Sequence, residues 1–287
     1  MSKQRTHKVT TSDGVTIRGT VHGDGPPLVF LQGIIGDGDL DWTSVLPHLT
    51  DRFTCHLPSM RGRGLSSDHP DLSLGRLIDD FLVYVDSLGE RTGLVGWSAG
   101  ANWSLAVAAQ SDAVAGVAPF EPVANSLMDE RERAALGSAI ARATELAGDG
   151  DLVAAMRAFA AYPFTDDEIE LAEDAGFFTA AGRYVPNMLG VFERLMEHVG
   201  QLPDDPAVLG TISAPVVVLH GSATKPFFVT SAQHMAANVP NARVHEIRGA
   251  GHCAPLTHPQ ALAEALSMVF WPSVARPAVS APSQQPA

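Results

Sequence analysis

A five-residue stretch, Gly96-Trp97-Ser98-Ala99-Gly100, has the residue types needed to present a serine hydroxyl as a nucleophile. It follows an apolar run and opens a helix-like stretch from Ala101 to Gln110, so the serine falls on a strand-to-helix turn. Such a turn strains the backbone of the serine and leaves room only for small neighbours, which the two glycines and the alanine provide. Free N–H groups at the start of the helix would favour an oxyanion beside Ser98.

A serine hydroxyl is a poor nucleophile until a base accepts its proton. Of the eleven histidines, His252 ends the stretch Gly249-Ala250-Gly251-His252, between the last strand pattern and the last helix pattern. The glycines would let this loop pass close to Ser98. We therefore predict that His252 is the base, and we expect the other histidines to be surface or core residues.

The composition indicates which kinds of molecule the protein is suited to bind. The 287 residues include 19 basic and 32 acidic ones, a net charge of −13, which disfavours nucleic acid and anionic membranes and favours small neutral substrates. Cys55 and Cys253 form neither a disulfide framework nor a metal-type pair. The first eleven residues carry no apolar signal segment, and no window reaches eighteen consecutive apolar residues. We expect a cytoplasmic protein with no membrane association.

The elements that must position Ser98 and His252 alternate along the chain. Alternation of polar and apolar residues predicts a hairpin over 9–11 and 15–21. Further strands are expected over 28–31, 53–57, the run before Ser98, 114–120, 215–219 and 243–247, and helices over 42–49, 74–88, 101–110, 228–238 and 259–270. This order predicts an α/β fold, a mainly parallel doubly wound sheet with helices on both faces.

Between the strands expected over 114–120 and 215–219, the pattern changes. Residues 125–206 show helical spacing without a strand-like run, for example over 129–147, 151–161 and 188–199, and contain 16 acidic against 6 basic residues. We expect an inserted helical cap over 124–210, an α/β core formed by 1–123 and 211–272, and a disordered tail over 273–287 that is rich in proline, serine and alanine.

From Val9 to Phe270 the chain resembles the α/β-hydrolase family. The matching parts are an oxyanion loop at Gln32-Gly33-Ile34, a glycine-rich turn over 61–66, the turn at Ser98, and the late His252. The resemblance implies that Ser98 is the nucleophile and His252 the base. It also implies an oxyanion hole formed by the backbone N–H groups of Ile34 and Ala99, and such donors are worth about 10²–10³ in rate.

The acid that would orient His252 departs from the common pattern. Many family members carry an aspartate shortly after the strand that follows the cap, but here Thr224 stands at that place, and no Asp or Glu occurs over 206–245. Other members carry the acid after the strand that precedes the cap, where this chain has Glu121. We predict that Glu121 is the acid; the alternative is a glutamate that anchors the cap. We expect the acidic group Asp37, Asp39 and Asp41 to form a solvated turn or helix cap.

Two further residues are candidates for the substrate pocket. Trp97 would line it or pack in the core. Gln32 replaces the histidine that usually begins the oxyanion loop; it would face the pocket or make a structural hydrogen bond. The guanidinium groups of Arg61 and Arg63 could attract an anion, but their glycine spacing favours a structural turn.

These residues favour a serine hydrolase that cleaves a carboxylic ester or lactone of a small, largely apolar substrate through an acyl-enzyme, with no cofactor and no metal. The same residues would suffice for hydrolysis of a carbon–carbon bond next to a carbonyl. A binding protein or receptor with little turnover is a further alternative, because a fold does not fix a function. The sequence leaves the substrate and the oligomeric state open.

Overall fold

The computed structural model describes residues 5–274, and its eight strands form one sheet in the order β1-β2-β4-β3-β5-β6-β7-β8. β1 pairs antiparallel with β2, β2 pairs antiparallel with β4, and all other neighbours are parallel. The strands are β1 (Arg5–Thr10), β2 (Thr16–His22), β3 (Pro27–Leu31), β4 (Thr54–Pro58), β5 (Thr92–Trp97), β6 (Val114–Phe120), β7 (Val216–Gly221) and β8 (Ala242–Ile247). The predicted mainly parallel α/β sheet is confirmed.

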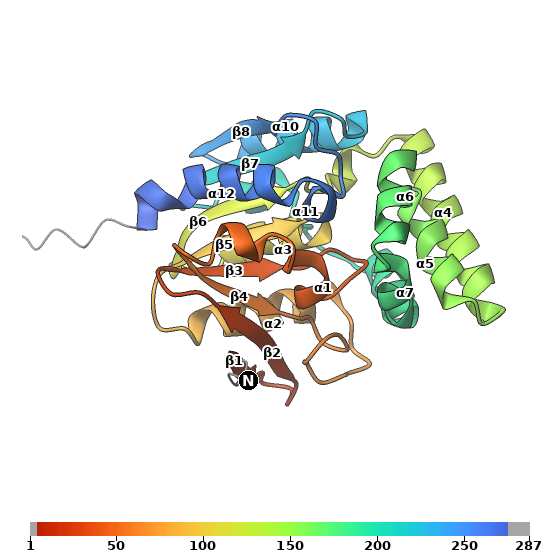
Figure 1. Ribbon diagram of the computed structural model, residues 1–287, viewed down its shortest axis with the longest axis horizontal. Helices are drawn as coiled ribbons and strands as arrows, with labels where there is room; N and C mark the ends of the chain where they lie inside the picture. Colours follow the sequence, from red (N-terminus) through yellow and green to blue (C-terminus); the bar gives the residue numbers. More distant parts are fainter. Residues whose placement is uncertain (1–4, 275–287) are drawn as a thin grey trace, which may run out of the picture.

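Helices cover both faces of this sheet, as the apolar strand sequences require. Every residue of β3, β5 and β7 is buried, as expected of parallel strands with both faces covered. Figure 1 shows α12 (Pro259–Val274) in front of the sheet, and α2 (Leu74–Asp86) and α3 (Ala99–Ala108) behind it. A further helix, α10 (Pro226–Asn238), packs against β7 and β8. The parallel strands therefore end together at one edge of the sheet, where the candidate site residues follow them.

One predicted helix was placed wrongly. Instead of a helix over 42–49, the chain forms α1 (Gly38–Trp42) and the 3₁₀ turn η1 (Leu46–His48). Asp37 caps α1 by accepting a hydrogen bond from the N–H of Leu40, which starts the helix earlier than the apolar pattern indicated. The short helix α11 (Ala254–Thr257), which follows His252, was not predicted, because four residues are too few to show a period.

The helices between β6 and β7 belong to one stretch, residues 124–210, which we call the inserted segment. In Figure 1, α4 to α7 stack together beyond the arrowheads of the strands. Of the long helix α4, only Ala143 is buried, which matches the acidic, solvated face expected from the sequence. The elements are η2 (Asn125–Leu127), α4 (Glu130–Gly148), α5 (Leu152–Ala160), α6 (Asp166–Asp174), α7 (Phe177–Ala181), η3 (Gly182–Tyr184), α8 (Val185–Met196) and α9 (Pro206–Leu209).

The C-terminal boundary also differs from the expectation. Helix α12 runs to Val274, so it passes the predicted end of the core at 272 and includes the first two residues of the predicted tail. The remainder of the predicted disordered tail, residues 275–287, lies outside the described residues. Within residues 5–274, no helix is both long and apolar enough to cross a membrane.

Candidate active site

Ser98 occupies the sharp turn that the sequence predicted between β5 and α3. Its backbone angles are φ 56° and ψ −117°, a conformation that L-residues rarely adopt. A Cβ atom on Gly96 would lie 2.2 Å from the carbonyl oxygen of Gly100, and one on Gly100 would lie 2.3 Å from that of Gln32. The two glycines are thus required by the close approach of β3, β5 and α3, and this packing holds the strained serine in place.

Glu121 follows β6 directly, next to Ser98 in space. The N–H of Ser98 donates to the carbonyl of Phe120 at 2.9 Å, and the N–H of Glu121 donates to the carbonyl of Leu219 at 2.8 Å. Glu121 has a φ of 48°, and among the described residues it is the only non-glycine besides Ser98 with a positive φ. Strain of this kind persists where the surrounding structure fixes it, and it gathers at functional sites.

The carboxylate of Glu121 contacts His252. Its Oε2 atom lies 2.7 Å from Nδ1 of the imidazole, and both side chains are almost completely buried. The structure therefore brings together the two residues that the sequence proposed as acid and base, although 131 positions separate them. A carboxylate on Nδ1 leaves Nε2 as the nitrogen able to exchange a proton with a hydroxyl group.

Thr224 and the backbone of Gly221 also hold this carboxylate. The hydroxyl of Thr224 donates to Oε2 of Glu121 at 2.7 Å, and the N–H of Gly221 donates to Oε1 at 2.9 Å. Thr224 stands where many family members carry the acid, so the residue at that position here supports an acid supplied by the neighbouring strand. Sequence reasoning identified the place but not this role; the signal was a hydroxyl residue where a carboxylate was expected.

Aromatic rings surround the imidazole of His252. Phe228 stacks on it with ring centroids 4.0 Å apart, and Phe164 of the inserted segment lies 6.0 Å away. The indole N–H of Trp97 donates to the backbone carbonyl of His252 at 2.7 Å. Trp97 also lines the cavity beside Ser98, so it is both a pocket residue and a support for the histidine loop.

Ser98 and His252 line the same cavity. Among the described residues, no hydrogen bond joins Ser98 to His252. Such bonds are often long in a free enzyme and shorten when substrate binds. The backbone positions expected to form the oxyanion hole, Ile34 and Ala99, line this cavity as well. Ala99 is the first residue of α3, so its N–H has no partner within the helix.

Arg63 holds the oxyanion loop from behind. Its Nη1 atom donates to the carbonyls of Ile34 at 2.7 Å and Gly36 at 2.8 Å, and its Nε atom donates to Oδ1 of Asn187 in α8 at 2.8 Å. Burial lowers the pKa of Arg63 to about 10, so the guanidinium remains charged at neutral pH. This residue is a loop support, in agreement with the structural turn favoured by the sequence.

The acidic group near this loop is less exposed than expected. Asp41 is 1% exposed rather than solvated, and its Oδ2 atom accepts the N–H of Gly33 at 2.7 Å. Burial raises the pKa of Asp41 well above its usual value, against the opposing effect of the Gly33 hydrogen bond. Asp37 is the helix cap that the sequence allowed, although it is buried too. The expectation of a solvated turn was wrong, because α1 packs this loop against β3 and β4.

Gln32 does not line the cavity. It is fully buried, its side-chain nitrogen donates to the carbonyl of Gly36 at 2.7 Å, and its side-chain oxygen accepts the N–H of Met60 at 2.9 Å. The expectation that Gln32 faces the pocket was therefore wrong, and the alternative of a structural hydrogen bond holds. The side-chain amide links the oxyanion loop to the loop after β4. Both polar atoms of the side chain are used in this way.

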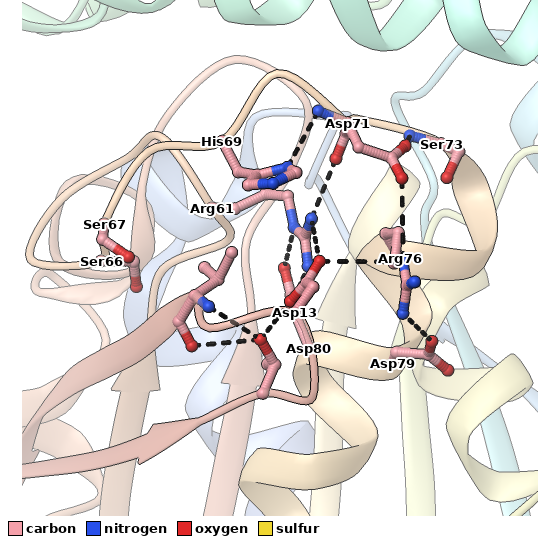
Figure 2. Close-up of polar contacts among 12 residues, drawn as sticks. Asp13, Arg61, Ser66, Ser67, His69, Asp71, Ser73, Arg76, Asp79 and Asp80 are labelled. Atoms are coloured by element: carbon pink, nitrogen blue, oxygen red, sulfur yellow. Dashed lines mark hydrogen bonds and ion pairs between the residues drawn. The ribbon is translucent and has the colours of Figure 1, made fainter.

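Arg61 anchors the loop after β4 (Figure 2). Its guanidinium is bidentate to Asp80 of α2, at 2.8 and 2.7 Å, and also donates at 3.0 Å to Asp13 in the turn between β1 and β2. A fourth bond of 3.0 Å reaches the carbonyl of Asp71. The side chains of Arg61 and Asp80 are fully buried. These partners neutralise the arginine, so it offers no site for an anionic substrate.

The cavity at Ser98 is apolar and of a size that suits a small molecule. Its volume is about 120 Å³. Core and inserted segment both contribute to its wall, and no Asp, Glu, Lys or Arg side chain does. The inserted segment contributes mainly apolar side chains: Met128, Leu136, Phe159, Pro163, Phe164, Val191, Phe192, Leu195 and Leu202. No cluster of three or more His, Cys, Asp or Glu side chains that could hold a metal ion occurs in residues 5–274.

Comparisons with known proteins agree with the fold. Similar solved structures include an α/β hydrolase from Sphaerobacter thermophilus, 26% identical, with a TM-score of 0.73 and coverage of 92% of this chain and 100% of that chain. Two esterases, from Thermogutta terrifontis and a Rhodococcus species, are each 21% identical, with TM-scores of 0.74 and 0.75 and coverage of 94% of this chain and 99% of theirs. The search of curated proteins gave no match.

A sequence model described as the alpha/beta hydrolase family matches residues 21–265, which reach from the end of β2 into α12 and include Ser98, Glu121 and His252. The match covers most of the chain and agrees with the order of strands and helices. The chain therefore belongs to the α/β-hydrolase family.

Proposed function

We propose that this protein is a serine hydrolase that cleaves carboxylic esters or lactones. The observation that carries the proposal is the buried contact of Glu121 with His252, at 2.7 Å, beside an apolar cavity that Ser98 also lines. A serine hydroxyl, an imidazole and a carboxylate are the three groups of a catalytic triad. The imidazole accepts the proton of the hydroxyl, and the carboxylate stabilises the imidazolium that forms.

In the proposed reaction, the hydroxyl oxygen of Ser98 attacks the acyl carbonyl while Nε2 of His252 accepts its proton. The negative charge that forms on the carbonyl oxygen is stabilised by the N–H groups of Ile34 and Ala99. The tetrahedral intermediate then expels the alcohol, which takes the proton from His252. Water, deprotonated by the same imidazole, releases the acid from Ser98 and restores the hydroxyl. Glu121 keeps the imidazole oriented and stabilises its charged form.

The wall of the cavity supports a small, largely apolar substrate. An ester or lactone is neutral and would enter without losing the solvation of a charge, whereas the wall offers no ion pair to an anion or cation. The two esterases among the similar structures share only 21% identity with the chain, and that likeness shows the fold alone. The proposal therefore depends on the site itself.

The contact between Glu121 and His252 also bears on the alternative functions. The missing carboxylate after β7 is the best support for a low-turnover binding protein, and the contact of Glu121 with His252, together with the bond from Thr224, weighs against it. Hydrolysis of a carbon–carbon bond next to a carbonyl would use the same groups, and no contact in the cavity favours it over ester cleavage.

Covalent labelling tests the proposal directly. A fluorophosphonate probe should label the wild-type protein, and Ser98→Ala should abolish labelling while leaving the melting temperature within a few degrees. A panel of neutral esters and lactones of increasing size then identifies the substrate class. A folded wild-type protein that the probe leaves unlabelled would refute the nucleophile, and labelling without turnover of any ester or lactone would favour the carbon–carbon alternative.

We also propose the division of the chain into a core, 1–123 and 211–272, and a cap formed by the inserted segment. The wall that this segment contributes to the cavity supports it. A cytoplasmic location, a small-molecule partner and the absence of nucleic-acid and membrane binding remain predictions. The unpaired, buried Cys55 and Cys253 and the net charge of −13 support them.

A further inference from the structure

A buried carboxylate of the inserted segment lies against the histidine loop. Glu168, in the first turn of α6, is 6% exposed, and its Oε1 atom accepts the backbone N–H of Cys253 at 2.6 Å. Cys253 directly follows His252. The bond therefore runs from a helix of the inserted segment to the peptide next to the candidate base, across 85 positions of sequence.

The second oxygen of this carboxylate is also used. Its Oε2 atom accepts the N–H of Thr165 at 3.0 Å, and the hydroxyl of Thr165 accepts the N–H of Glu168 at 3.3 Å, which makes a capping box. A capping box needs only one carboxylate oxygen and is commonly exposed. Helix capping therefore accounts for Oε2 but leaves the buried Oε1 bond to Cys253 unexplained.

The histidine loop is shaped to receive this side chain. A Cβ atom on Gly251 would lie 2.5 Å from Oε1 of Glu168, so only glycine lets the loop approach so closely. Within residues 5–274, no Lys, Arg or His side chain forms an ion pair with Glu168. The ammonium of Lys225 donates instead to the carbonyls of Ala161, at 2.9 Å, and Tyr162, at 2.5 Å. Burying a carboxylate is costly unless its oxygens are hydrogen-bonded, and here backbone N–H groups from two separate segments supply those bonds, which points to a positional role.

The thiol of Cys253 does not account for the arrangement. Burial, and then the negative charge of Glu168, raise the pKa of this thiol well above its usual value. The group is therefore neutral and unreactive at physiological pH. What the carboxylate fixes is the backbone of Cys253, and with it the peptide that carries His252.

We propose that Glu168 is a positioning residue for His252, so that the inserted segment helps to assemble the catalytic site as well as to enclose it. The inference rests on the proposed function. Glu121 and Trp97 hold the ring and the carbonyl of His252, and Glu168 holds the N–H of the next residue. Any movement that lifts α6 from the core breaks this bond and frees the loop, and a displacement of about 1 Å at a catalytic group can cost about 10²-fold in rate.

The test compares two variants of Glu168 with a matched control variant. Glu168→Ala removes both bonds and should lower kcat by about 10–10² with little change in KM, because Glu168 does not line the cavity. Glu168→Gln keeps a carbonyl oxygen for the N–H of Cys253 and should recover most of that loss. Thr165→Ala weakens the cap of the same helix without touching the histidine loop, so it should lower the melting temperature and leave kcat within about 3-fold.

A double-mutant cycle adds a check that does not depend on the stability of one variant. Gly251→Ala should slow fluorophosphonate labelling in the wild-type background, because its Cβ displaces the carboxylate, and should do so much less in the Glu168→Ala background. Additive effects, or a Thr165→Ala variant as slow as Glu168→Ala, would overturn the inference. If the folded wild-type protein shows no labelling that depends on Ser98, the proposed function itself is refuted.

Discussion

Glu121 and Thr224 follow neighbouring strands and meet at one carboxylate oxygen. The carboxylate of Glu121 reaches Nδ1 of His252 from β6, and Thr224, after β7, supplies a hydroxyl to the same oxygen atom. That oxygen therefore accepts two hydrogen bonds while Oε1 accepts the N–H of Gly221. Because both oxygens of the carboxylate are hydrogen-bonded, its orientation is fixed. The orientation of the imidazole that it contacts is fixed in turn.

Glu121→Gln is expected to lower kcat by about 10²–10⁴, since a neutral amide allows the wrong tautomer of His252 and gives the imidazolium no counter-charge. KM should change much less, because Glu121 does not line the cavity. Steady-state kinetics on the best ester of the panel measure both constants. Near-normal turnover would contradict the role of Glu121 and favour a serine–histidine pair.

Thr224→Val should cost less than the loss of Glu121, about 3–30-fold in kcat, because it removes one of the neutral donors that orient the carboxylate. Thr224→Ser keeps the hydroxyl and should stay near the wild-type rate. Thr224→Asp combined with Glu121→Ala moves the carboxylate to the more common place and should restore part of the rate lost in Glu121→Ala. If Thr224→Val and Thr224→Ser have equal kcat values, the hydroxyl has no positioning role.

Strand β4 carries a histidine whose titration couples pH to stability. His56 is buried between β2 and β3, its Nδ1 atom is 3.4 Å from the hydroxyl of Tyr84, and its pKa is lowered to about 4, chiefly by burial and then by the charge of His7. The unfolded chain, with a histidine pKa near 6.5, binds the proton more readily than the folded protein. Stability contributed by neutral His56 is thus complete above pH 6.5 and is lost as the pH falls towards 4.

Between pH 7 and 4 the wild-type protein should therefore lose up to about 3 kcal/mol more free energy of unfolding than His56→Gln. The variant should be less stable at pH 7 but have a flatter pH profile. Urea unfolding at half-unit steps of pH measures the difference. Parallel profiles for the two proteins would show that His56 does not titrate in this window.

The inserted segment forms hydrogen bonds with the loops of the site as well as packing over them. Besides Glu168 on the histidine loop, the hydroxyl of Tyr184 donates to Asp37 and accepts the N–H of Gly64, and Asn187 accepts from Arg63. These bonds join η3 and α8 to the oxyanion loop and its support. Movement of the inserted segment therefore costs buried hydrogen bonds on both sides of Ser98.

For the whole molecule, the charge distribution limits what can reach Ser98. The protein has a net charge of −13, residues 125–206 alone contribute −10, and the cavity wall contains no Lys or Arg. An anionic substrate is thus repelled at long range and left unpaired in the cavity. A neutral substrate meets neither penalty.

A substrate with a free carboxylate should therefore react at least about 10²-fold more slowly, in kcat/KM, than its neutral methyl ester at pH 7. The monoester and the diester of one short dicarboxylic acid make the matched pair, since the ester bond that is cleaved is of the same kind and only the other end of the acyl group differs in charge. Raising the ionic strength should narrow the difference only slightly, because salt screens the surface charges and not the cavity. Equal kcat/KM values would show that a cation, not evident in the cavity wall, reaches the substrate.

The sequence by itself determined the α/β class, the order of strands and the strained turn at Ser98, because these depend on neighbouring residues: burial on both faces gives continuous apolar strands, and close approach requires glycine. It also led to Glu121, because no Asp or Glu occurs over 206–245 and the resemblance to the family offered the end of the preceding strand as the other place for the acid. Glu121 contacts His252, as the sequence predicted, and the catalytic role of Glu121 stays a prediction.

Only the tertiary structure decided what holds these groups. Thr224 meets Glu121 across 103 positions and Glu168 meets Cys253 across 85, and neither pair leaves a periodic or local pattern. The sequence left Gln32 between the pocket and a structural hydrogen bond, and it indicated a solvated turn or helix cap for Asp41. Both side chains instead bond to buried backbone groups that become their neighbours only on folding. A hydrogen bond forms between groups that the fold brings together, so the support of the site depends on how distant loops cross, which local sequence does not encode.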